Sequence, residues 1–120
     1  MIIIRKEFHF SASHVLANLP PEHPCSRMHG HNYVITVELR VKRSKELTEA
    51  GFVQDYRELD VIKNYIDNRL DHYHLNDVFD FNPSAELMAI HLYTEWKKIL
   101  PKLAAVEVCE TPKTSARYEP

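Results

Sequence analysis

The sequence predicts an α+β domain in which a four-stranded antiparallel sheet carries two helices on one face. Three observations predict it: two alternating apolar and polar segments open the chain, the middle third repeats apolar residues at three- and four-residue spacing, and two more alternating segments close it. The order ββααββ, without internal repeats, is typical of helices segregated to one face of a sheet. The 120 residues have the length of one domain, so we expect a single domain over residues 1–120.

The first strand is expected to end at a histidine. In I-I-I-R-K-E-F-H-F-S-A-S-H, every second residue from Phe8 to Ala12 is apolar, and His14 shares this parity. A proline-rich loop follows and ends at Cys25. The second strand alternates from Tyr33 to Val41.

The parity of the second strand places two more histidines on its apolar side, His29 and His31, just before the strand begins. If the two strands pair antiparallel, the end of the first lies beside the start of the second, and both histidines meet His14. Three imidazoles with one open position are typical of a catalytic zinc site. We therefore expect Zn²⁺ here; the alternative is three ordinary core or surface histidines.

A first helix is expected to begin at Asp55, where Asp55 and Glu58 resemble a capping box, and to end near Leu70. A loop over residues 77–84 leads to the second helix. Asn82 or Ser84 can cap this helix, residues 87–100 form it, and a proline at 101 stops it.

The closing strands are expected at 103–110 and 115–118. A four-stranded sheet of this kind has two open edges, so we expect other copies of the chain to cover them in a homo-oligomer.

The composition excludes several function classes. The net charge is −2, and no stripe of Lys or Arg indicates nucleic-acid binding. No apolar run reaches membrane length, and the apolar start is too short for a signal peptide. With two cysteines a disulfide framework is not expected, and a cytoplasmic location fits best.

Cys25 precedes His29 by four residues, and two roles fit this spacing. As a fourth ligand, the thiolate would close a structural zinc site. As an acid/base group beside an open site, it would have its thiol pKa lowered by zinc and imidazole. The spacing does not decide between these roles.

Two further groups can carry proton chemistry or bind a substrate. In Asp71–His72, the carboxylate could orient the imidazole, but a histidine at a helix end more often complements the helix dipole. Glu110, at the end of a strand, could accept two N–H bonds from an amino-substituted heterocycle, although a solvated strand end is commoner.

Six motifs in order span nearly the whole chain: S-A-S-H-V-L, C-S-R-M-H-G-H-N-Y, V-Q-D-Y-R-E-L, L-D-H-Y-H-L-N, N-P-S-A-E and E-T. Together they resemble the 6-pyruvoyl-tetrahydropterin synthase family, and most closely its bacterial branch, the 6-carboxytetrahydropterin synthases (QueD) of queuosine biosynthesis. The short spacer between Cys25 and His29 matches that branch. Ser84 departs from the threonine that is usual in the family.

The resemblance implies a tunnelling fold (T-fold), in which the sheets of several subunits join into an oligomeric β-barrel, most commonly a hexamer. It implies that zinc binds the three histidines and that Cys25 is the catalytic base. It further implies that Asp71 and His72 form a proton relay and that Glu110 anchors the pterin ring.

The implied reaction is that of a carbon–carbon and carbon–oxygen lyase. It converts 7,8-dihydroneopterin triphosphate into 6-carboxytetrahydropterin, acetaldehyde and triphosphate. The triphosphate needs cations, for which Arg27, Lys113 or Arg117 are candidates. The nearer alternative is a pyruvoyl-forming or related side-chain lyase of the same fold. The more distant alternative is a non-enzymatic oligomer stabilised by zinc.

Overall fold

The computed structural model describes all residues from 1 to 120 and contains four strands and three α-helices. The strands are β1 (Ile2–His14), β2 (His29–Val41), β3 (Leu103–Thr111) and β4 (Thr114–Tyr118), and the helices are α1 (Asp60–Arg69), α2 (Leu75–Val78) and α3 (Ala85–Lys97). The molecule is elongated, with extents of 55 × 25 × 25 Å, because β1 and β2 each run for 13 residues. None of the helices combines the length and hydropathy of a bilayer-spanning segment.

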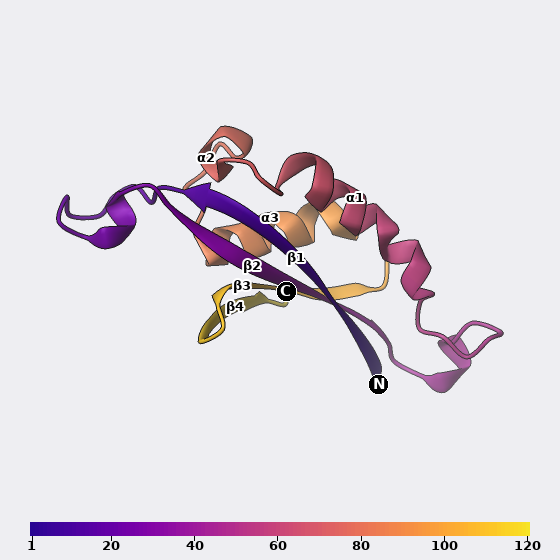
Figure 1. Ribbon diagram of the computed structural model, residues 1–120. Helices are drawn as coiled ribbons and strands as arrows, with labels where there is room; N and C mark the ends of the chain where they lie inside the picture. Colours follow the sequence, from indigo (N-terminus) through magenta and orange to yellow (C-terminus); the bar gives the residue numbers. More distant parts are fainter.

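The strands form one antiparallel sheet in the order β1-β2-β3-β4, and α1 and α3 lie over one of its faces (Figure 1). The α+β architecture expected from the sequence is therefore confirmed. β1 and β2 pair along their whole length, from Ile2 opposite Val41 to His14 opposite His29. This register brings the end of β1 beside the start of β2.

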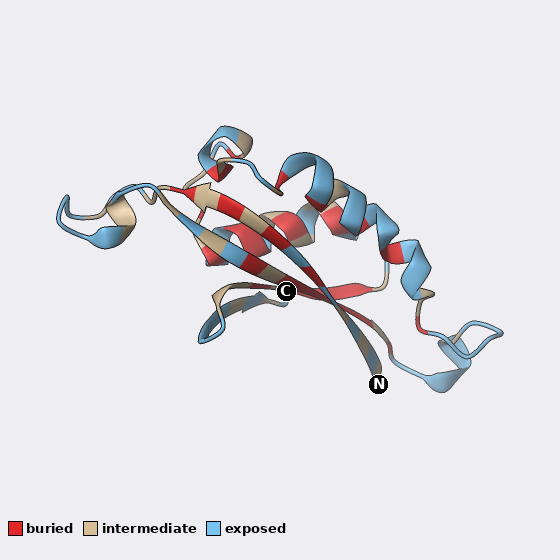
Figure 2. Ribbon diagram, in the orientation of Figure 1, coloured by how far each residue is buried: buried red, intermediate tan, exposed pale blue.

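The hydrophobic core lies between the sheet and the helices. Along β2, every second side chain from Tyr33 to Val41 is buried, as the alternation predicts. The inward stripe of α3 includes Met88, Leu92 and Trp96, and the buried stretches of both helices face the sheet (Figure 2). Burial of this apolar surface is the main force that fixes the helices on the sheet.

The first helix differs from its expected form in its first turn. Asp55 caps the segment as expected, and its side chain accepts a hydrogen bond from the Arg57 N–H at 2.9 Å. Residues Tyr56–Leu59 form a 3-10 turn, however, and the α-helix begins only at Asp60. 3-10 turns are frequent at helix starts, and periodicity over four residues does not distinguish the two forms.

The second helical region also differs in detail. Ser84, rather than Asn82, caps α3, and its hydroxyl accepts from the Leu87 N–H at 3.2 Å. α3 ends at Lys97, three residues before the expected end. A single-turn helix, α2, occupies part of the segment expected to be a loop. One turn is too short to show a 3.6-residue period in the sequence.

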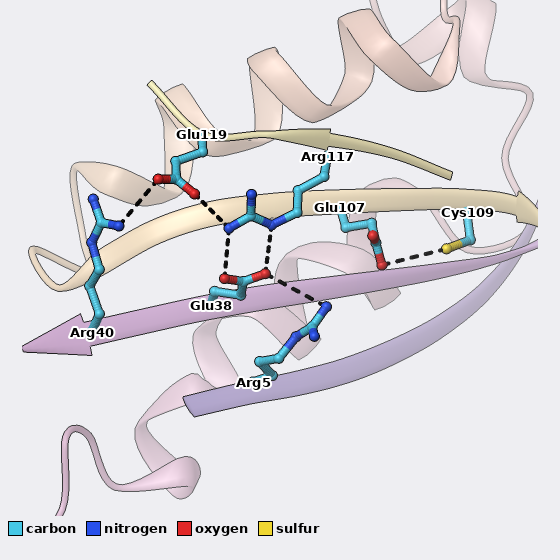
Figure 3. A network of polar contacts seen from close by, with 7 residues as sticks. All are labelled: Arg5, Glu38, Arg40, Glu107, Cys109, Arg117 and Glu119. Carbon is cyan, nitrogen blue, oxygen red and sulfur yellow. Dashed lines mark hydrogen bonds and ion pairs between the residues drawn. The ribbon is translucent and has the colours of Figure 1, made fainter. Parts of the chain in front are cut away.

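The face of the sheet without helices carries a network of charges centred on Glu38 (Figure 3). The Glu38 side chain is only 7% exposed, and Arg117 of β4 donates to both its oxygens at 2.7 and 2.8 Å. Arg5 of β1 lies 3.6 Å from the same carboxylate, and Arg117 also contacts Glu119. The hydrogen bonds from Arg117 lower the pKa of Glu38 against the opposing effect of burial. The network ties β1, β2 and β4 together.

Candidate metal centre and surrounding site

Three histidines meet at the end of the sheet where β1 finishes and β2 begins. His14 is the last residue of β1, and His29 and His31 are the first and third residues of β2. One ring nitrogen from each lies within 4.8 Å of the other two. The long β1–β2 register and the shared parity produce this cluster, as the sequence predicts.

Hydrogen bonds to the outer ring nitrogens fix two of these rings. His14 Nδ1 lies 2.8 Å from the Pro83 carbonyl oxygen, and His29 Nδ1 lies 2.8 Å from the Arg27 carbonyl oxygen. A carbonyl only accepts, so each Nδ1 carries the proton and donates it. Each Nε2 is then left with a free lone pair in the neutral ring.

The inner nitrogens of the cluster face one another without a proton donor between neutral rings. His14 Nε2 and His29 Nε2 are 2.9 Å apart, which places two lone pairs in contact. His31 Nε2 is buried and has no hydrogen-bond partner, with the Glu110 carboxylate 3.4 Å away. A bound cation would satisfy all three nitrogens, so the residues present fit a metal ion.

The surroundings disfavour the charged form of two of the three imidazoles. Burial lowers the pKa values of His14 and His31, and this effect outweighs the raising influence of Glu110. Neutral imidazole is the form that binds metals. Burial likewise raises the pKa of Tyr33, whose ring packs edge-on against both histidines, so this phenol stays protonated.

Cys25 lies in the loop that joins β1 to β2, within the 3-10 turn Pro24–Ser26. Its thiol is free and half-buried, and it is not among the atoms that converge on the cluster. Its backbone is held on both sides: the N–H donates to His23 Nδ1 at 3.0 Å, and the carbonyl accepts from the Leu16 N–H at 3.0 Å. The loop lies at the same end of the sheet as the histidines (Figure 1).

Glu110 connects the histidine cluster to a hollow of about 470 Å³. Its carboxylate lies 3.4 Å from His31 Nε2 on one side. The hollow is bounded by the first residues of α3, Ala85 and Glu86, and by the β3–β4 hairpin from Val108 to Arg117. The arrangement could hold a flat polar ring against a carboxylate.

Asp71 and His72 follow α1 and lie along the outer edge of β1. Asp71 Oδ2 is 3.0 Å from His72 Nδ1, and Asp71 Oδ1 accepts the Ser11 N–H at 3.0 Å. These hydrogen bonds, the one from Ser11 first, lower the pKa of Asp71. His72 adopts a left-handed backbone with φ of 66°, and its side chain is 83% exposed. His72 and His31 line one open groove of about 570 Å³.

The three candidate phosphate-binding cations have different surroundings. Arg27 is exposed in the β1–β2 loop, and Lys113 is exposed in the turn between β3 and β4. Arg117 is committed to ion pairs with Glu38 and Glu119. The structure therefore leaves Arg27 and Lys113 as the free cations of the three.

Several groups around the site were not singled out from the sequence as parts of it. The carbonyls of Pro83 and Arg27 orient two ligand rings, and main-chain acceptors leave no sequence signal. Two asparagines, Asn76 and Asn82, bind the chain just after His14. Both stand inside motifs recognised in the sequence, L-D-H-Y-H-L-N and N-P-S-A-E, which is the signal that could have indicated them.

Comparison with known proteins agrees with this arrangement. The family model for 6-pyruvoyl tetrahydropterin synthase matches residues 3–120. A 6-carboxy-5,6,7,8-tetrahydropterin synthase from Synechocystis is 38% identical over 98% of this chain and 93% of its own length. A putative enzyme of the same name from Archaeoglobus fulgidus is 31% identical over 72% of this chain and 68% of its own. The structure of Caenorhabditis elegans 6-pyruvoyl tetrahydropterin synthase superposes with a TM-score of 0.84 at 26% identity, covering 99% of this chain and 95% of that one.

Proposed function

The chain belongs to the 6-pyruvoyl tetrahydropterin synthase family, and from this premise we propose that it is a zinc-dependent 6-carboxy-5,6,7,8-tetrahydropterin synthase. The substrate is 7,8-dihydroneopterin triphosphate, and the products are 6-carboxytetrahydropterin, acetaldehyde and triphosphate, with one water consumed. The reaction belongs to queuosine biosynthesis in the cytoplasm. The relatives that carry this name support the choice of product.

The observation that carries the proposal is the convergence of three imidazole nitrogens, two of which turn their lone pairs toward each other at 2.9 Å. His14, His29 and His31 would hold Zn²⁺, for which three histidines and one open position are typical of catalytic sites. The ion, when bound, supplies positive charge that stabilises the oxyanion formed as a substrate proton leaves.

Cys25 is the proposed base. As a thiolate it would take the proton from the side-chain carbon that becomes the enolate carbon. The hydrogen bond that ties its loop to the chain just after β1 supports this role. The thiol does not converge on the histidine nitrogens, which supports a base rather than a fourth ligand.

Asp71 and His72 are the proposed relay for the later protons. The Asp71 carboxylate accepts from His72 Nδ1 at 3.0 Å, so it fixes the tautomer and leaves Nε2 free to exchange protons with the substrate. The relay is needed when triphosphate is eliminated and when the side-chain carbon–carbon bond breaks. The exposed position of His72 on an open groove fits a group that meets a bound molecule.

Glu110 is the proposed anchor for the pterin ring. Its carboxylate can accept two N–H bonds from the amino-substituted edge of the ring, which fixes the reacting carbon near the histidines. The exposed Arg27 and Lys113 are the proposed contacts for the triphosphate.

The two sheet edges support the proposed homo-oligomer, with a hexamer expected from the family. At one edge, residues 72–74 already cover the end of β1, through the Ser13 bridge to His74, so only its first part is open. At the other edge, β4 is unpaired on its outer side. An antiparallel pairing of β4 with the open part of β1 in another copy satisfies both edges.

The product decides between this proposal and its nearest alternative, a pyruvoyl-forming synthase, which the C. elegans structural relative represents by name. The zinc-loaded protein is incubated with 7,8-dihydroneopterin triphosphate, and the products are identified by mass spectrometry. We expect 6-carboxytetrahydropterin and acetaldehyde in equal amounts. A pyruvoyl pterin as the sole product would support the pyruvoyl-forming alternative. If a metal-loaded oligomer converts no substrate, the result would support the alternative of a non-enzymatic oligomer stabilised by zinc.

A further inference from the structure

The outer edge of β1 binds the segment that follows α1. The Ser11 N–H donates to Asp71 Oδ1 at 3.0 Å, and the Ser11 carbonyl accepts from the His72 N–H at 2.7 Å. Two residues further along, the Ser13 N–H donates to the Tyr73 carbonyl at 3.2 Å. Odd-numbered residues of β1 thus turn their main-chain groups toward this edge.

Two asparagine side chains continue the same ladder beyond the strand. The Val15 N–H donates to Asn76 Oδ1 at 2.8 Å, and the Val15 carbonyl accepts from Asn76 Nδ2 at 2.9 Å. Asn82 binds Ala17 in the same two ways, at 2.9 and 3.3 Å. A carboxamide has one acceptor and two N–H donors, so each side chain replaces the peptide group of a neighbouring strand.

The opposite side of this extended segment holds the cysteine loop. Leu16, between the two residues held by asparagines, donates its N–H to the Cys25 carbonyl at 3.0 Å. Most of the remaining hydrogen bonds of the loop are internal, such as those from Ser26 Oγ to the Pro21 and His23 carbonyls. One leads out of the loop, from His29 Nδ1 to the Arg27 carbonyl. Three prolines, at positions 20, 21 and 24, offer no N–H for further pairing. Of the hydrogen bonds that Cys25 itself makes, only the one to Leu16 leads out of the loop, so residues 15–17 fix one side of its position and His29 fixes the other.

We propose that Asn76 and Asn82 are positioning residues for the reaction. Their carboxamides hold residues 15–17 as an extended strand, and through the Leu16 bond they fix Cys25 relative to the three histidines. The inference rests on the proposed role of Cys25 as the base. A displacement of the base by roughly 1 Å can cost about 10²-fold in rate, so the effect falls on turnover rather than on binding.

The experiment compares Asn76→Ala and Asn82→Ala with Asn64→Ala, a matched control on the exposed side of α1. In Asn76→Ala and Asn82→Ala we expect faster hydrogen exchange at the Leu16 amide and an altered alkylation rate of Cys25 at fixed pH. Bound zinc stays near the wild-type amount. We expect kcat to fall by about 10- to 100-fold while KM stays within about twofold. The control behaves as wild type.

A double variant separates positioning from general loosening. If the asparagines act through Cys25, Asn76→Ala added to Cys25→Ala causes no further loss of the residual turnover. If Asn76→Ala lowers the turnover of the Cys25→Ala protein by the same factor as it lowers that of the wild type, the proposal is overturned. A wild-type kcat in both single variants overturns it as well. If Asn82→Ala does not fold, Asn76→Ala, whose side chain lies at the surface, decides alone.

Failure of the proposed function is distinguishable from failure of this inference. If no variant and no wild-type protein converts the pterin, the proposed function is wrong. Exchange at Leu16 and alkylation of Cys25 still report whether the carboxamides hold the loop. If the Leu16 exchange rate and the Cys25 alkylation rate are both unchanged in Asn76→Ala and Asn82→Ala, the inference is contradicted, whatever the activity.

Discussion

At the scale of residues, the orientation of the ligand rings is set before any metal binds. His14 and His29 each donate an Nδ1 proton to a main-chain carbonyl, so both present an Nε2 lone pair to the same point. Such outer hydrogen bonds fix ring orientation and make the imidazole a better ligand. The site is therefore preorganised by the backbone at Pro83 and Arg27.

Removal of one ligand tests this arrangement. We expect about one zinc per chain in the wild type, and loss of most of it in His29→Ala and in His31→Ala, because two remaining ligands hold zinc weakly. Metal analysis of the purified proteins measures it. His9→Ala, whose side chain is 70% exposed on β1, is the control and keeps its zinc. Full occupancy in both ligand variants would exclude the site.

Glu110 gives a second prediction at this scale. Glu110→Gln replaces one acceptor oxygen by a donor, so a ring that offers two N–H groups loses one charge-assisted hydrogen bond. Such a bond is worth about 1.5–3 kcal/mol, which corresponds to a fall in kcat/KM of about 10- to 150-fold. Steady-state kinetics measures it, with zinc content as the control. A variant with unchanged kcat/KM would remove Glu110 from ring binding.

Strand parity is enough to predict the histidine cluster from the sequence, whereas the local patterns around Cys25, Asp71 and Glu110 leave the roles of these residues open. His14, His29 and His31 share a face, and the antiparallel register then brings them together. The Pro83 carbonyl that orients His14 and the contact of Glu110 with His31 come from segments far apart in the chain. No periodicity reports such contacts, so they appear only in the folded structure.

At the scale of elements, the charge network on the open face joins three strands. Arg117 reaches from β4 to Glu38 of β2, and Arg5 approaches from β1. We expect Glu38→Ala to lower the free energy of unfolding by about 1–2 kcal/mol, since it removes hydrogen bonds to a charged group but leaves Arg117 partly hydrated. Urea unfolding measures it. Glu119→Gln, at the exposed end of the network, should change the free energy of unfolding much less, because an exposed ion pair is screened by water. Equal effects of the two would contradict the central place of Glu38.

The same network makes stability depend on pH. Arg117 lowers the pKa of Glu38 in the folded state below the ordinary value of 4.5. The carboxylate therefore contributes stability above pH 4.5, and this contribution is lost as the pH falls through the lower folded-state pKa. Unfolding of the wild type at pH 7 and in more acidic buffer should show this loss, and Glu38→Gln should show a smaller one. Equal pH dependence in both proteins would refute it.

Long helices and strands were predicted better from the sequence than short turns and the ends of elements. The two long strands and the inward stripes of α1 and α3 follow from apolar spacing. The 3-10 turn at Tyr56–Leu59 and the single-turn helix α2 could not be predicted in this way, because four residues are too few to show a repeating apolar pattern. Their form depends on local capping and on packing against the rest of the chain.

At the scale of the whole molecule, the sheet leaves main-chain groups unpaired at both edges. Since Ser11 and Ser13 direct theirs outward, the odd residues nearer the start of β1 direct theirs to the open edge. We expect a stable homo-oligomer, a hexamer on family grounds. Glu7→Pro, which removes one N–H from that edge only, should dissociate it. Sedimentation at micromolar concentration measures the oligomeric state of the wild type and of Glu7→Pro, with circular dichroism as the control for folding. A monomeric wild type would contradict the shared barrel.

If the metal site is open and Cys25 is its base, the Cys25→Ala variant should keep its metal and lose its activity. Zinc content, melting temperature and product formation from 7,8-dihydroneopterin triphosphate are measured on the same preparation. We expect wild-type zinc content and melting temperature, with turnover lower by at least about 10²- to 10⁴-fold, the contribution of a positioned acid/base group. A variant that loses zinc and melts at a lower temperature would show that Cys25 is a structural ligand instead.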